Sequence, residues 1–185
     1  MLRFCFFMSL GLTMLMGCKT KAKLIQSEKE KIYLFPLEWI GLYEGELLVF
    51  NETKDTNIVQ MKLEVRSPNA EGYYPWTIQY GESDIRAYGL EVINADKGHY
   101  IIDEFNSIKL DSYLRDNHFI SHFNVMNSDL LVDYERVNGG IVVNLYFSQA
   151  QPVSLTGSEI IGKDTIPEVK SFKVPVFQKA FLKKQ

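Results

Sequence analysis

Two pairs of arginine and tyrosine are spaced two residues apart in the chain, Arg86 with Tyr88 and Tyr134 with Arg136. Residues two apart on a β-strand point to the same face, so each pair presents a guanidinium and a phenol together. A guanidinium offers a planar fork of donors that matches a carboxylate, and the phenol adds one more donor. On an interior face these pairs predict a site for a ligand carboxylate. On an exterior face the arginine stem packs on its tyrosine instead.

An aromatic segment lies just before Arg86 in the sequence. Alternation places Tyr74, Trp76, Ile78 and Tyr80 on one face of a strand. Such a face can line a pocket for a small apolar ligand, or it can simply fill a core. The candidate ligand-binding residues are Tyr74, Trp76, Tyr80, Arg86, Tyr88, Tyr134 and Arg136.

An arginine that points into a water-poor interior requires a partner, because an unpaired buried charge is costly. For Arg86 we expect this partner to be either a ligand carboxylate or an acid from another strand. Glu104 is the candidate acid, since it shares a face with Tyr100 and Ile102.

Other combinations of reactive side chains indicate no particular chemistry. His118 and His122 share a strand face but lie about 13 Å apart at about 3.3 Å per residue, too far to share one metal ion. Asp133 and Glu135 also share a face, which we interpret as a solvated surface. No nucleophile elbow, phosphate loop or dinucleotide fingerprint is present. We therefore predict no metal, no cofactor and no catalytic residue, although a hydrolase site assembled from distant strands would leave no local motif.

The elements that position these residues are short strands separated by turn residues. Asn94 to Gly98 and Asn138 to Gly140 have the composition of hairpin loops. Regular spacing without a helical period predicts an all-β fold, an antiparallel up-and-down β-barrel of about 8–10 strands. The expected strands cover residues 41–50, 56–67, 73–80, 85–93, 99–105, 107–114, 118–125, 129–137 and 141–148, followed by a long connection over 149–168 and a final strand within 169–183.

The start of the first strand resembles the calycins, the superfamily of lipocalin-like and fatty-acid-binding-like barrels. Their first strand carries Gly-x-Trp after a short helical turn that plugs the barrel, and here the motif is Gly41-Leu42-Tyr43, with Trp39 as an alternative plug. The resemblance implies a calycin-like barrel with an interior ligand site. Barrels of this kind that bind fatty acids hold the carboxylate with an interior Arg and Tyr. Heme-binding members use a His near the last strand, and residues 169–183 contain none.

A second resemblance concerns the N-terminus. Leu15-Met16-Gly17-Cys18 follows Arg3 and an uncharged apolar run, a pattern that resembles the lipobox of bacterial lipoproteins. The resemblance implies cleavage before Cys18, acylation of Cys18 with fatty acids such as palmitate, and a lipid anchor in the cell envelope. An ordinary signal peptide with a chance cysteine is the alternative. We expect a signal peptide over residues 1–17, a lipidated polar tether over 18–33 and one barrel domain over 34–185.

Composition limits the possible partners. Cleavage would leave 168 of the 185 residues, with 19 basic and 23 acidic side chains, a formal charge of −4, and no thiol except that of Cys18. A mildly acidic chain without a basic run argues against nucleic acid as a partner. The expected partners are the membrane through the lipid anchor, a small apolar ligand and an envelope protein.

Three functions are compatible with the sequence. The first is a lipid-anchored cell-envelope lipoprotein whose barrel binds a small apolar or amphipathic molecule, such as a lipid or fatty acid. The second is a structural or assembly lipoprotein that acts through protein–protein contacts. The third is a hydrolase with a dispersed site. A pocket lined by Tyr74, Trp76 and Arg86 would favour the first function, and a filled interior would favour the second.

Overall fold

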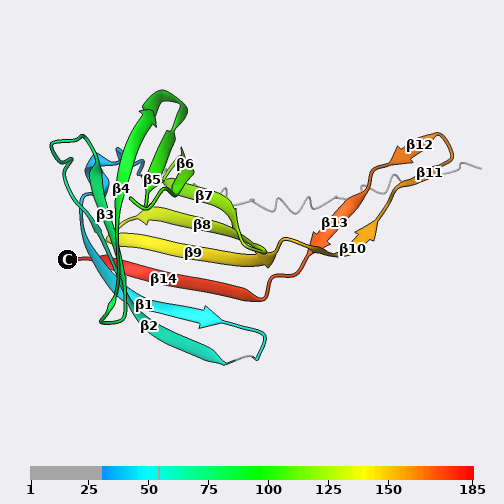
Figure 1. Ribbon diagram of the computed structural model, residues 1–185, viewed down its shortest axis with the longest axis horizontal. Helices are drawn as coiled ribbons and strands as arrows, with labels where there is room; N and C mark the ends of the chain where they lie inside the picture. Colours follow the sequence, from blue (N-terminus) through cyan, green and yellow to red (C-terminus); the bar gives the residue numbers. More distant parts are fainter. Residues whose placement is uncertain (1–30, 54) are drawn as a thin grey trace, which may run out of the picture. The chain divides into compact units, whose positions relative to one another are not determined.

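The computed structural model describes residues 31–53 and 55–185. Ten antiparallel strands close into an up-and-down barrel in which neighbours in the chain are neighbours in the sheet (Figure 1). The closing pair is β1 with β14. The predicted fold class is therefore confirmed. The barrel strands are β1 (Gly41–Phe50), β2 (Thr56–Val65), β3 (Tyr74–Tyr80), β4 (Asp84–Asn94), β5 (His99–Asp103), β6 (Lys109–Arg115), β7 (His118–Val125), β8 (Ser128–Val137), β9 (Gly140–Gln149) and β14 (Val176–Lys184).

The predicted long connection over residues 149–168 lies outside the barrel, but it contains strands that the sequence did not predict. These are β10 (Pro152–Thr156), β11 (Glu159–Ile161) and β12 (Asp164–Ile166), and β13 (Val169–Phe172) follows. β10 pairs only with β13, and β11 only with β12, so residues 150–175 form a two-stranded ribbon, here called the arm (Figure 1). The expected final strand over 169–183 is thus divided between the arm and the barrel. Its propensity for strand is real, but Lys173 to Pro175 interrupt it.

The two ends of the barrel differ. At the closed end a single turn of 3-10 helix, η1 (Leu37–Trp39), precedes β1, and the side chain of Trp39 is fully buried. The ring of Phe35 packs edge-on against Trp39 with 4.9 Å between centroids and stacks on Phe119 at 4.8 Å. Tyr43 is also fully buried and donates its hydroxyl to the Trp39 carbonyl at 2.7 Å. Trp39 and Tyr43 therefore plug this end together.

Residues 31–33, which we assigned to the tether, contact the barrel. Tyr33 is buried, and its backbone N–H donates to Oδ1 of Asn117 at 2.9 Å. The amide of Asn117 in turn donates to the carbonyl of Lys31 at 2.7 Å. The expected signal peptide, Cys18 and the tether up to residue 30 lie outside the described residues. The part of the chain that the structure describes contains no helix with the length and hydropathy of a membrane span.

Strand alternation assigns the interior face as predicted. Val132, Tyr134 and Arg136 on β8 are buried, and so are Trp76 and Ile78 on β3. Gly45 allows β1 to curve closely over β14, because a Cβ there would lie 2.2 Å from the Phe181 carbonyl oxygen. The opposite end, called the open end, carries the β1–β2, β3–β4, β5–β6 and β7–β8 connections and the arm between β9 and β14. The plug of Trp39 and Tyr43 closes one end of the barrel, so the interior is accessible from the open end.

Candidate functional site

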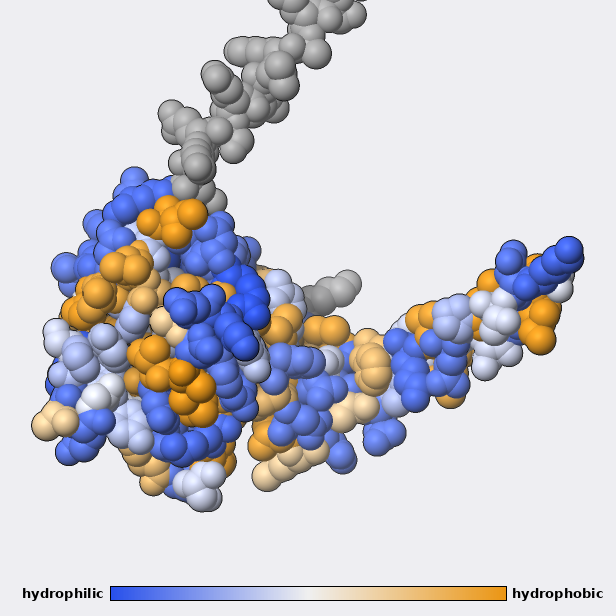
Figure 2. Space-filling model, turned by 90° about the horizontal axis from the view of Figure 1, so that it is seen from above, coloured by the Kyte–Doolittle hydropathy of each residue, from blue (hydrophilic) through white to orange (hydrophobic). Residues whose placement is uncertain are grey.

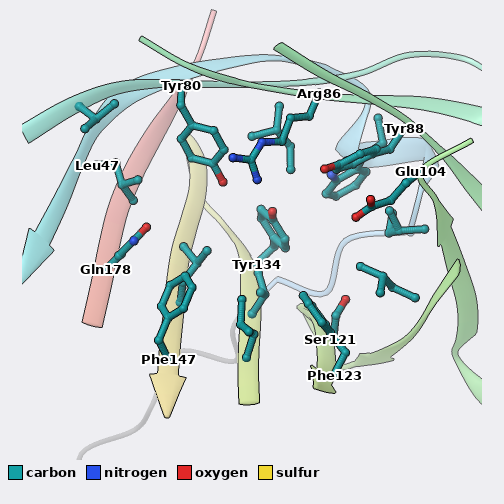
Figure 3. Close-up of a pocket in the computed structure, with 18 of the residues that line it drawn as sticks. Leu47, Tyr80, Arg86, Tyr88, Glu104, Ser121, Phe123, Tyr134, Phe147 and Gln178 are labelled. Carbon is teal, nitrogen blue, oxygen red and sulfur yellow. The ribbon is translucent and has the colours of Figure 1, made fainter. Parts of the chain in front are cut away.

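A cavity of about 440 Å³ occupies the open half of the barrel, and all ten barrel strands or their ends contribute to its wall (Figure 3). Most of the wall is aliphatic or aromatic, and its charged residues lie on β4 and directly after β5. The lining residues are Leu47, Val49, Val59, Trp76, Ile78, Tyr80, Arg86, Tyr88, Ile102, Glu104, Leu110, Ser121, Phe123, Leu130, Val132, Tyr134, Leu145, Phe147 and Gln178.

Arg86 reaches the cavity from near the start of β4, and its partner is Asp84. The guanidinium donates from Nε to Oδ1 of Asp84 at 3.1 Å and from Nη2 to Oδ2 at 2.9 Å. It also lies over the ring of Tyr80, 4.9 Å from the centroid. The hydrogen bond from Arg86 holds the pKa of Asp84 below its usual range, and the same bond raises the pKa of Arg86. The side chain of Arg86 is 48% exposed, so the pair lies at the mouth rather than in a dry interior.

The expected pairing of Arg86 with Glu104 is therefore wrong. Asp84 shares the strand face of Arg86, because the two residues are two apart on β4. We missed it since the predicted strand began at Ile85, one residue after Asp84. An acid two residues from an arginine at the edge of a turn is the sequence signal that would have found it.

Glu104 does line the cavity, on the side opposite Tyr80 in Figure 3. Gly89 pairs with Asp103, so the next position along the ladder sets Glu104 across from Tyr88. The loop after β5 holds it there: the backbone N–H of Glu104 donates to the Ile108 carbonyl at 3.0 Å. One Glu104 oxygen accepts from the Asn106 amide at 3.2 Å. Burial raises the pKa of Tyr88, and the charge of Glu104 raises it further.

The inner end of the cavity is formed by aromatic rings. Tyr134 is buried, and its ring meets that of Trp76 edge-on with 5.4 Å between centroids. Burial raises the pKa of Tyr134 well above its usual range, so its hydroxyl stays protonated at neutral pH and can donate a hydrogen bond. Ser121 lies close by on β7 and shares a hydrogen bond of 2.6 Å with Ser112.

The predicted site residues separate into two groups. Trp76, Tyr80, Arg86, Tyr88 and Tyr134 line one cavity, as predicted for residues of an interior face. The remaining two, Tyr74 and Arg136, do not line it. Tyr74 packs against the core from the closed-end half of β3. The sequence did not single out Phe123 or Gln178, which also line the cavity.

Arg136 is buried at the closed end instead. Its Nη1 donates to the carbonyls of Val137 and, at 2.7 Å, of Gly140. Its guanidinium lies 4.3 Å from the centroid of Tyr33 and 5.6 Å from that of Tyr43. The expected clamp of Tyr134 and Arg136 on one ligand carboxylate is therefore wrong. Two residues along a strand are enough to move Arg136 past the inner end of the cavity.

The histidines and paired acids of β7 and β8 lie on the outer face. His118 Nδ1 is hydrogen-bonded to Asp133 at 3.0 Å, and Nε2 approaches Glu135 at 3.9 Å. His122 is exposed and faces Leu131 across the ladder. Among the described residues no three His, Cys, Asp or Glu side chains are grouped closely enough to hold a metal ion. These side chains form a polar surface apart from the cavity.

The fold and the cavity define a class, the closed antiparallel barrel with an interior pocket. The chain is similar in structure to a protein of unknown function from the DUF3598 family of Nostoc punctiforme, with a TM-score of 0.60 and 9% identity. The match covers 84% of this chain and 51% of that protein, so the chain spans about half the length of its structural neighbour. No family model and no curated protein matches the sequence.

Proposed function

We propose that the protein is a lipid-anchored cell-envelope lipoprotein whose barrel binds a small apolar or amphipathic molecule. The observation that carries this proposal is the interior cavity of about 440 Å³. Binding pockets for small molecules are typically about 300–1,000 Å³, mostly apolar, with a few converging polar groups. A long apolar wall with Arg86, Tyr88 and Glu104 near the mouth fits a ligand that has an apolar body and one polar end.

The binding experiment uses two neighbouring positions on β2. Val59 lines the cavity, whereas Ile58 points outward and is exposed. Native mass spectrometry of the protein purified from its own envelope should show a co-purified small molecule in the parent and in Ile58→Trp. The Val59→Trp protein should lose it, because an indole fills the mouth. An equal amount of ligand on both variants, or none on the parent, would contradict the proposal.

The anchor is tested separately. The Leu15-Met16-Gly17-Cys18 pattern supports acylation of Cys18 and an attachment to the membrane. Cys18→Ala should remove the protein from the membrane fraction, with Cys5→Ala as the control. A processed Cys18→Ala protein that stays with washed membranes would show that the attachment does not depend on lipid.

The arm supports a second candidate, an assembly lipoprotein that contacts another envelope protein. Apolar side chains are exposed along the whole ribbon, and Ile160, for example, is 77% exposed. Figure 2 shows hydrophobic and hydrophilic residues interspersed on it. A two-stranded ribbon is marginal in water and offers free strand edges to a partner strand. Free edges and charges such as Lys163 and Asp164 do not suit lipid hydrocarbon, so a protein partner is favoured.

This candidate is tested by replacing residues 151–174 with a short turn. Cross-linking in the intact envelope should give a product with the parent that the armless protein lacks. Ligand retention measured on the same sample separates the two functions, because the cavity wall contains no residue of the arm.

A further inference from the structure

The charges around the cavity do not balance. Arg86 is the cation of the wall, and its Nε and Nη2 donate to the carboxylate of Asp84. Glu104 is the other charged residue of the wall, and it forms no ion pair among the described residues, its one side-chain bond being that from the neutral Asn106 amide. With Arg86 and Asp84 cancelling, the charge left facing the cavity is negative.

Hydrogen bonds and an ion pair order the loop that carries Glu104. Asp103, the preceding residue, accepts from the Phe105 N–H at 2.8 Å and pairs with Lys109 at 3.0 Å. The side chain of Asn106 bridges Glu104 and the Ile108 N–H, the latter at 3.0 Å. These bonds hold Glu104 with its carboxylate towards the cavity and beside the Tyr88 ring (Figure 3).

A carboxylate ligand meets two obstacles in this pocket. It must share the positive charge of Arg86 with Asp84, which already occupies Nε and Nη2, and it must approach the negative charge of Glu104. An ammonium group meets neither. A cation between a carboxylate and the face of a tyrosine gains both a charge-assisted hydrogen bond and a cation–π contact.

We propose that the ligand of this pocket is a cationic amphiphile, with its ammonium group bound between Glu104 and Tyr88 and its apolar chain along the wall towards Trp76. This inference rests on the proposed function and names its ligand class. It replaces the fatty-acid carboxylate that the Arg and Tyr spacing suggested in the sequence. Arg86 is then part of the cavity wall, where Asp84 and the ring of Tyr80 hold it in place, and it does not bind the charged group of the ligand.

Three probes with the same twelve-carbon chain test this proposal: dodecylamine, dodecanol and dodecanoate. Each is titrated calorimetrically, below its micelle concentration at pH 7, into the full chain after removal of co-purified lipid. We expect dodecylamine to bind about tenfold more tightly than dodecanol, and dodecanoate to bind most weakly.

The matched variants are Glu104→Gln and Glu46→Gln. Both remove one negative charge, but Glu46 is an exposed residue on the outer face of β1. Glu104→Gln should abolish the preference for dodecylamine over dodecanol while keeping dodecanol affinity, which also shows that the barrel is folded. Glu46→Gln should change neither.

The outcomes distinguish this inference from the proposed function. If none of the three probes binds the parent, the pocket function fails. If dodecanoate or dodecanol binds most tightly, or if Glu104→Gln keeps the preference for the amine, the pocket function stands and the cationic ligand is wrong.

Discussion

The barrel and the arm consist of the same kind of alternating strand, yet they bury different amounts of side chain. On β9 every second residue from Ile141 to Leu145 is buried, whereas all four residues of β13 are exposed. Each barrel strand has two neighbours and an opposite wall, while each arm strand has one neighbour and no wall. Alternation therefore buries a face only where a closed sheet supplies the other side, which teaches that a strand pattern alone does not define a core.

The barrel and the arm should differ most in the unfolding free energy that is lost when a large side chain is removed. Trp76 is 1% exposed and contacts Phe119 and Tyr134. Trp76→Ala should lower the free energy of unfolding by about 3–5 kcal/mol, because it leaves a cavity. Urea denaturation followed by tryptophan fluorescence of Trp39 measures this. If Phe172→Ala in the arm lowered it equally, the arm would belong to the same core.

The closed end should depend on Arg136 for stability, not for binding. Arg136→Met removes the donors to the Val137 and Gly140 carbonyls and the contact with Tyr33. We expect a loss of about 1.5–3 kcal/mol in unfolding free energy. The same titrations with twelve-carbon probes should give unchanged affinities. A change in affinity without a loss of stability would place Arg136 in the binding site.

Acid should weaken the open end of the barrel through Asp103. The Phe105 N–H and then Lys109 hold the pKa of Asp103 below that of an ordinary aspartate. A carboxyl group with a lowered pKa stabilises the fold above its unfolded pKa, about 3.9, and this contribution is lost as the pH falls through the folded value. Unfolding curves between pH 6 and about pH 2.5 should therefore show a steeper loss of stability for the parent than for Asp103→Asn. Parallel curves would contradict this role.

Arg86→Ala should have only a small effect on stability. A pair that is about half exposed on both partners contributes roughly 0–1 kcal/mol, in contrast to a buried pair. The melting temperature should fall by no more than a few degrees, as scanning calorimetry would show. A loss as large as that of Trp76→Ala would mean that Arg86 is part of the buried core.

The smallest effect is expected in the arm. Changing Ile160 and Ile161 to serine should alter the unfolding free energy by no more than about 0.5 kcal/mol each, since both side chains are exposed. The cross-linked product of the envelope experiment should nevertheless disappear. Unchanged cross-linking would leave the exposed apolar residues of the arm without a role in partner binding.

The sequence by itself determined most of the barrel strands, the hairpins and the faces of β3, β4, β8 and β9. Period-two alternation and turn residues are local, so Trp76, Tyr80 and Tyr134 were placed on interior faces correctly. The depth of each residue along the barrel is not local, because it depends on how the whole sheet closes. Only the tertiary structure separated Arg86 at the mouth from Arg136 at the plugged end. The pairing of Arg86 with Asp84 lies within one strand, and the predicted strand boundary at Ile85 concealed it. The tertiary structure also decided that the chain after Gln149 leaves the barrel as an arm, because closure of the sheet requires β14, and not β10, beside β9.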